Sequence, residues 1–206
     1  LPANPVEIQP LEYAGETLAS KVGRIRKSLR ELHADGMLVS ALDDIAWTLN
    51  LRGTDVHCNP VFVSYLLIES GKVSLFVDDN KLSPEVKQYL QDNQVSLYNY
   101  NKVEKCLESY SEYNILLDGN ETSYYLWKAV KCQEIVAAGS PIPAMKAVKN
   151  KAEIEGYHSA MLKDGVAMVK FLKWLKPAVE AGGQTEISID EKLTSLRAEQ
   201  KLFRDI

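Results

Sequence analysis

Polar side chains with chemical potential are concentrated in one short stretch of this chain, Arg52–Asn59. The stretch brings Asp55, His57, Cys58 and Asn59 together, a polar density that exceeds what a turn needs. Histidine, cysteine and aspartate are common metal ligands, so metal binding is the first chemistry to consider. We treat this stretch as a candidate functional loop.

The spacing of the histidines does not favour a metal site. Neighbouring side chains in an extended segment point to opposite faces, so His57 and Cys58 are not expected to share an ion. His33 lies near the end of a predicted helix, where an imidazolium suits the helix dipole. His158 has no Asp, Glu or His at a chelating spacing, and no HExxH motif occurs. Both are predicted to be packed or surface side chains.

Other catalytic patterns are missing from the sequence. The three cysteines, Cys58, Cys106 and Cys132, are far apart and form no CxxC pair, which predicts reduced thiols rather than a zinc ribbon or redox motif. Neither a GxSxG nucleophile elbow nor a GxxxxGK[ST] phosphate loop is present. The residues alone therefore predict an α/β domain with one polar loop.

Composition sets the broad class. The 206 residues are 46% hydrophobic and 25% charged, as in an ordinary globular protein that buries a core. The net charge of −4 argues against a nucleic-acid partner. Apolar runs such as Val61–Ile68 are too short to span a membrane, and no signal peptide begins the chain. The start at Leu-Pro without Met predicts a piece of a longer protein.

Strands and helices are expected to alternate, which indicates an α/β sandwich with a mixed sheet. Hydrophobic periodicity, Gly, Pro and capping residues set the expected bounds. The predicted elements are an extended linker (Leu1–Pro10), a helix closed by Gly36 (Gly15–Asp35), a strand (Met37–Ala41), a helix capped by Asp43 and Asp44 (Ile45–Asn50), a hairpin (Val61–Ile68 with Val73–Val77), a helix (Ser83–Gln91), a strand (Val95–Tyr98), a helix (Lys102–Tyr110), a strand (Ile115–Asp118) and a helix (Ser123–Val130).

A segment with Gly and two prolines, Ala138–Pro143, is predicted to be a domain boundary. After it, Asn150 and Glu153 form a capping-box pair for a long helix that Pro177 is expected to end. A second helix, capped by Thr185, is expected to be still running at the end of the chain. The apolar stripe of these helices has no strand to cover it and is predicted to belong to a sheet beyond residue 206.

Three ordered motifs carry a family resemblance. They are ALDDIAWTLNLRGTDV at 41–56 continued by NPVF at 59–62, AVKNKAEIEG at 147–156, and GQTEIS at 183–188. Together they resemble the three-domain Xaa-Pro aminopeptidases of the creatinase–prolidase superfamily. The resemblance covers essentially the whole chain.

The resemblance implies a three-layer α/β domain of the creatinase/prolidase N-terminal type, with a mixed sheet, followed by the first helices of a pita-bread catalytic domain. The implied organisation is an interdomain linker at 1–14, a middle domain at 15–143 and a truncated start of the catalytic domain at 144–206.

The resemblance also implies the activity of the parent protein. Such enzymes release the N-terminal residue of peptides with proline at the second position, using two divalent metal ions, commonly manganese. The ligands, two Asp, one His and two Glu, belong to segments downstream, so no catalytic or metal residue is assigned here and this chain alone is expected to be inactive. A cytoplasmic homodimer without nucleic-acid or membrane partners is expected.

By the same resemblance, the loop after the Trp47 helix approaches the mouth of the active site. Arg52, Asp55 and His57 are therefore the candidates for contacts at the substrate rim. The alternative is that Arg52 and Asp55 hold the loop by an internal ion pair. Trp47 is expected in the core. Two further readings stay open: a non-catalytic pita-bread relative that binds peptides or proteins, and a purely structural spacer.

Overall fold

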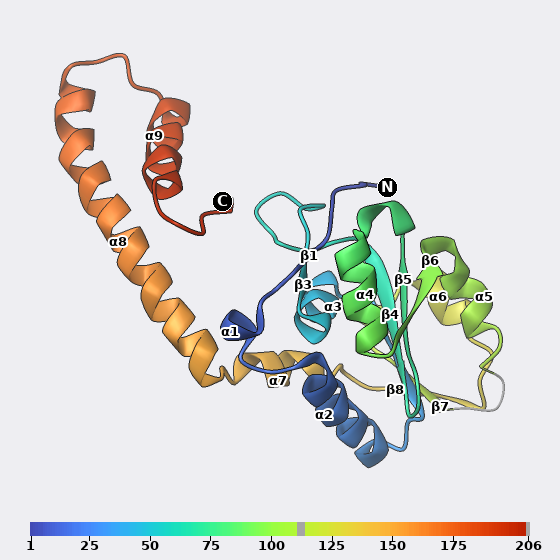
Figure 1. The fold of residues 1–206 in the computed structure, drawn as a ribbon. Helices are drawn as coiled ribbons and strands as arrows, with labels where there is room; N and C mark the ends of the chain where they lie inside the picture. The colour runs from blue at the N-terminus through green and yellow to red at the C-terminus, as the bar shows by residue number, and fades with distance from the viewer. Residues whose placement is uncertain (111–113, 205–206) are drawn as a thin grey trace. The chain divides into compact units, whose positions relative to one another are not determined.

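The structure is a computed structural model that describes residues 1–110 and 114–204 (Figure 1). The chain divides into two compact units, Leu1–Lys149 and Asn150–Ile206. Within the described residues, no helix combines the length and apolar character needed to cross a membrane.

A mixed sheet forms the centre of the first unit. Its strand order among the described residues is β6-β5-β4-β2-β7-β8, and β4 runs antiparallel to both of its neighbours while the other adjacent pairs are parallel. The strands are β2 (Gly36–Val39), β4 (Ser64–Glu69), β5 (Val73–Val77), β6 (Val95–Asn99), β7 (Asn114–Leu117) and β8 (Glu134–Ala137). The predicted mixed sheet is confirmed.

The predicted hairpin is present as β4 and β5, which pair in antiparallel register from Ser64 opposite Val77 to Ile68 opposite Val73. Every residue of β5 is buried, which explains its continuous run of apolar and small side chains. Strand β4 begins three residues later than predicted. Val61 and Phe62 are buried in the preceding loop instead of the sheet.

Helices cover both faces of the sheet, so the three-layer α/β fold is confirmed. One core packs α2, α3 and α4 against side chains such as Leu66 and Leu75, and the other packs α5 and α6 against Leu67 and Phe76. Neighbouring strand positions point to opposite faces, which divides the apolar residues between the two cores. The helices are α2 (Leu18–Glu31), α3 (Leu42–Leu49), α4 (Pro84–Asp92), α5 (Val103–Leu107), α6 (Tyr124–Ala129) and α7 (Ile142–Ala147), with short 3-10 turns η1 (Asp79–Lys81) and η2 (Tyr100–Lys102).

Two predicted helix ends are wrong. Helix α2 ends at Glu31 and its chain reversal uses His33 at φ 56°, whereas Gly36 is the first residue of β2. The N-cap of α3 is Ala41, which makes no side-chain cap. Asp43 and Asp44 lie in the first turn of that helix, where the dipole still favours acids.

The first residues of the chain are extended as predicted, but they pack onto the first unit. Strand β1 (Glu7–Ile8) pairs antiparallel with β3 (Leu51–Arg52), and Val6 is buried. A one-turn helix, α1 (Leu11–Ala14), follows and ends at Gly15, whose φ of 67° is readily adopted by glycine. The strand β8 and the helix α7 were also missed, and the latter packs on α3.

The second unit is a pair of helices, α8 (Lys151–Glu180) and α9 (Glu186–Ala198). The capping box of Asn150 and Glu153 is confirmed, and Thr185 caps α9. Helix α8 continues through Pro177, which lies in its last turn, and the Ala181 N–H bonds the Pro177 carbonyl. Helix α9 ends at Ala198, before the end of the chain.

The predicted domain organisation stays a prediction about the longer protein: a linker at 1–14, a middle domain at 15–143 and the start of the catalytic domain at 144–206. In the structure, Ile142 is fully buried in the core of the first unit. The last two residues of the predicted boundary segment thus begin one more helix of that unit, α7.

Candidate functional site

The candidate loop leaves helix α3 through a left-handed residue. Asn50 has φ 51° and caps the helix, and its side chain joins three segments. Its Oδ1 accepts a 2.6 Å hydrogen bond from the buried Lys21 ammonium, and its Nδ2 donates to the carbonyl of Glu16 at 2.9 Å. Lys21 also lies 4.2 Å from the ring centre of Trp47, which is partly buried against the core. These contacts fix the direction in which the loop starts.

Arg52 is held by the end of helix α3. Its Nη1 donates to the carbonyl oxygens of Ala46 at 3.1 Å and Leu51 at 2.8 Å. The Ala46 carbonyl also accepts the Asn50 N–H at the end of the helix, and a guanidinium beside this end is stabilised by the helix dipole as well as by its hydrogen bonds. The residue is partly exposed.

Asp55 turns inward and forms a buried ion pair. Its Oδ2 lies 2.5 Å from Lys81 Nζ, and the two side chains are 0% and 1% exposed. The same oxygen accepts a 2.6 Å hydrogen bond from the backbone N–H of Val63, whereas Oδ1 is buried with no recorded partner among the described residues. Lys81 is an ion-pair partner that the sequence did not indicate. The Asp55 carboxylate is therefore part of the interior of the loop.

His57 and Cys58 form the exposed tip of the loop. The side chains of His57 and Cys58 were predicted to point to opposite faces, and this prediction is wrong. Cys58 has φ 60°, and the chain turns between Val56 and Asn59. The turn brings the Cys58 Sγ to 2.6 Å from the His57 Nδ1. The two side chains thus contact each other at the surface.

Gly53 allows the two halves of the loop to approach closely. A Cβ atom at this position would lie 2.8 Å from the Cβ of Phe62 and 3.0 Å from the carbonyl oxygen of Val61. The backbone N–H of Gly53 donates to the carbonyl of Pro60, and that of Asp55 donates to Val61. The loop is a folded, hydrogen-bonded unit.

The described residues do not fit the two-metal group that the family resemblance implies. No group of three or more His, Cys, Asp or Glu side chains within residues 1–110 and 114–204 could hold a metal ion. The remaining histidines, His33 and His158, are both exposed. Cys106 and Cys132 are partly buried free thiols, and burial raises the pKa of each.

A second polar cluster, which the sequence did not reveal, lies where α7 meets the start of α3. Lys146 pairs with Asp43 and, at 2.7 Å, with Asp44. Burial raises the pKa of the Asp44 carboxyl, although Lys146 opposes this. Burial also pushes the pKa of Asp43 upward, but its hydrogen bond and attraction to Lys146 outweigh that, so this pKa ends below its ordinary value. The cluster therefore joins α7 to the first turn of α3 by ion pairs.

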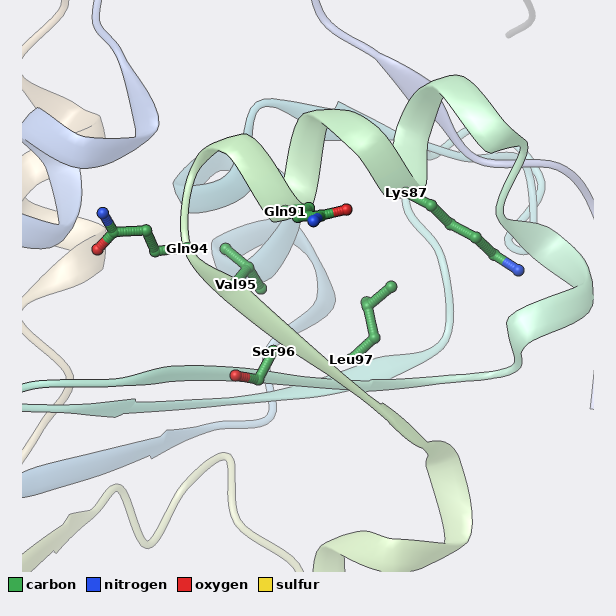
Figure 2. A pocket seen from close by; sticks show the side chains of 6 residues that line it. All are labelled: Lys87, Gln91, Gln94, Val95, Ser96 and Leu97. Carbon is green, nitrogen blue, oxygen red and sulfur yellow. The ribbon is translucent and has the colours of Figure 1, made fainter.

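Figure 2 shows an open depression in the angle between α4 and β6. Its volume is about 450 Å³, and its lining consists of Lys87, Gln91, Gln94, Val95, Ser96 and Leu97. The Lys87 ammonium pairs with Asp79 at 2.6 Å. The lining contains no carboxylate, thiol or imidazole that could act as a base toward the Ser96 hydroxyl.

Comparisons with known proteins agree with the geometry. Residues 1–153 match the model of the creatinase/prolidase N-terminal domain. The Xaa-Pro aminopeptidase ApepP of Drosophila melanogaster is 37% identical over 202 residues, which are 95% of this chain and 33% of that protein. Xaa-Pro aminopeptidase 1 of Dictyostelium discoideum is 35% identical over 208 residues, 98% of this chain and 33% of that protein.

Solved structures give the same result. The X-prolyl aminopeptidase from Caenorhabditis elegans, described as a cytosolic enzyme with a di-nuclear active site, has a TM-score of 0.88 at 27% identity and is matched over 98% of this chain and 34% of that one. The Xaa-Pro dipeptidase from Bacillus anthracis shares the fold, with a TM-score of 0.65 at 14% identity. The chain spans about a third of the length of its aminopeptidase relatives. It belongs to the creatinase/prolidase N-terminal domain family.

Proposed function

We propose that this chain is the supporting, substrate-rim part of a metal-dependent Xaa-Pro aminopeptidase, which releases the N-terminal residue from peptides with proline at the second position. The observation that carries the proposal is 35–37% identity to named Xaa-Pro aminopeptidases over 95–98% of the chain. A match of this length includes all three motifs, not only a shared fold.

Catalysis in the parent protein would depend on two divalent cations, which we propose to be manganese. The di-nuclear active site named for the nematode relative supports the number of ions. Bound cations supply a nucleophilic hydroxide and polarise the scissile carbonyl. The ligands are expected in the rest of the parent, because the described part of this chain does not fit the group.

Within this chain we propose the loop of Arg52, Asp55 and His57 as the substrate rim. His57 is exposed and Arg52 is partly exposed, which supports a contact with a peptide, and a guanidinium pairs well with a peptide carboxylate. Asp55 is buried, so it would act by holding the other two in position.

We further propose that the parent is a cytoplasmic homodimer. The cytosolic description of the nematode relative supports the location. The exposed apolar side chains of α8, such as Met161, Leu162 and Val169, are expected to be covered by the rest of the parent, so the dimer is proposed from the family resemblance alone. Sedimentation of the complete protein as a monomer at all concentrations would contradict the dimer.

The test compares the complete protein with the 206-residue chain, each supplied with manganese. The substrates are a peptide with proline at the second position and the same peptide with alanine there. We expect the complete protein to release the first residue of the proline peptide alone, and the 206-residue chain to release none. Absence of turnover by the complete protein would favour the non-catalytic, peptide-binding relative, and turnover by the chain would refute the assignment.

A second experiment separates a rim from a spacer. In the complete enzyme, Arg52→Ala should lower kcat/KM by about tenfold, which corresponds to roughly 1.4 kcal/mol of lost transition-state binding. The free energy of unfolding should change far less than for a core variant. An unchanged kcat/KM would support the spacer reading.

A further inference from the structure

The buried ion pair beneath the candidate loop has geometry that suits positioning rather than stability alone. Lys81 and Asp55 are 26 positions apart in sequence, and their Nζ and Oδ2 atoms meet at 2.5 Å with side chains 1% and 0% exposed. Removing two charges from water is costly, and the attraction repays that cost only when further hydrogen bonds satisfy both groups. Here Oδ1 of Asp55 is buried without a recorded partner in the described structure.

Both partners are anchored to neighbouring segments. The Asp55 oxygen that binds Lys81 also accepts the N–H of Val63, two residues after the Gly53–Val61 contact. On the other side, the carbonyl of Lys81 accepts a 2.9 Å hydrogen bond from the N–H of Val6. The Asn4 side chain donates to the carbonyl of Thr54 at 2.9 Å. The pair therefore joins the loop to the η1 turn and to the first strand.

We propose that Lys81 is a positioning residue. Through its ion pair with Asp55 it fixes the position and orientation of the loop that carries Arg52 and His57. This inference rests on the proposed rim function for its effect on substrate. Its physical core, a loop set by a buried charge pair, can be tested without turnover.

The experiment uses the complete protein and the variant Lys81→Met. Amide hydrogen exchange is followed in peptides that cover residues 52–63 and, as an internal reference, residues 73–77 of β5. Removal of the ammonium leaves the Asp55 carboxylate buried and unpaired, so the loop should open more often. We expect exchange in 52–63 to rise by about tenfold or more, while exchange in β5 stays within about twofold. Equal increases in both peptides would show that the pair is only a stabiliser and would overturn the proposal.

The double variant Asp55→Asn/Lys81→Met covers the case in which Lys81→Met alone does not fold. It removes both charges, and the Asn oxygen can still accept the Val63 N–H. Replacing a buried ion pair by well-packed apolar residues is often nearly neutral for stability, and the double variant avoids the unpaired carboxylate that Lys81→Met leaves. We expect Tm to return toward that of the unmodified protein while loop exchange stays raised. If loop protection is restored together with Tm, the pair does not position the loop and the proposal fails.

Lys87→Met is the matched control. It also removes a lysine–aspartate pair, with a 2.6 Å contact to Asp79, but these side chains are 39% and 70% exposed. Exposed pairs contribute little, so loop exchange should not change. A rise equal to that of Lys81→Met would mean that any local charge loss opens the loop, which would refute a specific role for Lys81.

The catalytic arm measures KM and kcat with a peptide that has proline at the second position. In the double variant, KM should rise on the order of tenfold with kcat changed by less than about threefold, because the rim binds and the reacting centre is elsewhere. An unchanged KM in a variant with an open loop would overturn the link to substrate. If no version of the protein cleaves the peptide, the proposed function fails, and the exchange result still decides whether Lys81 sets the loop.

Discussion

The two compact units use apolar residues in opposite ways. In the first, the sheet is packed on both faces, and Leu66, Leu67 and Leu75 are fully buried. In the second, α8 and α9 share a small cluster around Phe171, while Leu162 of α8 is 72% exposed. Apolar content alone therefore does not tell where a chain is stable. The first unit buries both faces of its sheet, whereas the helix pair leaves apolar side chains of α8 exposed.

The largest expected effect tests this contrast with one kind of change. Leu75→Ala removes a fully buried side chain from the centre of the sheet and should lower the free energy of unfolding by about 2–5 kcal/mol. Leu162→Ala should change it by less than about 0.5 kcal/mol. Urea denaturation of the 206-residue chain measures both. Similar losses would mean that the α8 stripe is covered in solution, for example by a second copy.

Replacing a glycine by alanine should change the stability in opposite directions in the two units. Gly53→Ala places a Cβ atom 2.8 Å from that of Phe62, so we expect a loss of about 1–3 kcal/mol from overpacking. Gly165 lies in α8 with nothing within 4 Å of an added Cβ, and Gly165→Ala should gain about 0.5–1 kcal/mol of helix stability. Thermal melts followed by circular dichroism distinguish these outcomes. A gain at both positions would show that the loop can relax around residue 53.

Helix caps should matter more where packing is sparse. Asn150→Ala removes the capping box of α8 and should cost about 1 kcal/mol, seen as lower helical signal before the main transition. Ser83→Ala removes the cap of α4, whose buried Val86 and Leu90 hold the helix in place. Its loss should appear in the main transition only. Early loss of helix in both variants would weaken the contrast between the units.

The smallest effect concerns alkaline pH. Burial, with a hydrogen bond to Tyr65, raises the pKa of Tyr100 from 10.0 to about 12. An unfolded tyrosine ionises first, so stability should fall as the pH rises from 10.0 to about 12. Burial also raises the pKa of Tyr89, and a hydrogen bond to Glu104 raises that of Tyr125, so ultraviolet absorbance titration should show several late phenols, of which Tyr100→Phe removes one. A step near 10.0 for this residue would contradict the packing of the first unit here.

Sequence reasoning recovered what local patterns determine. The β4–β5 hairpin, the α4 helix begun by Ser83 and Pro84, and the capping box of Asn150 each depend on residues a few positions apart. The three-layer fold followed from alternating strand and helix patterns together with a family resemblance. Gly36 and Pro177 were both predicted to end a helix, because glycine and proline favour helix ends. Gly36 instead begins β2, and Pro177 lies inside α8.

The missed features depend on contacts between distant positions. The Lys81–Asp55 pair joins residues 26 positions apart, and Lys146 reaches Asp44 across 102 positions. No local spacing indicates which lysine will find which acid. The contact between His57 and Cys58 was missed because it needs a left-handed residue at Cys58, a conformation that cysteine rarely adopts. Polar density singled out the loop as a candidate, and its role at a substrate rim stays a prediction, whereas the buried ion pair of Asp55 was not predicted.

Strand β1 has a practical consequence for anyone who prepares shortened versions of this protein. The residues predicted to be an extended linker, Leu1–Pro10, supply the strand that pairs with β3 and the N–H that bonds the Lys81 carbonyl. Trimming the chain to begin at residue 15 would remove β1 and leave the edge of β3 unpaired. An exposed strand edge favours aggregation. Shortened versions of the protein should therefore retain the residues from Asn4 onward, even when only the sheet is of interest.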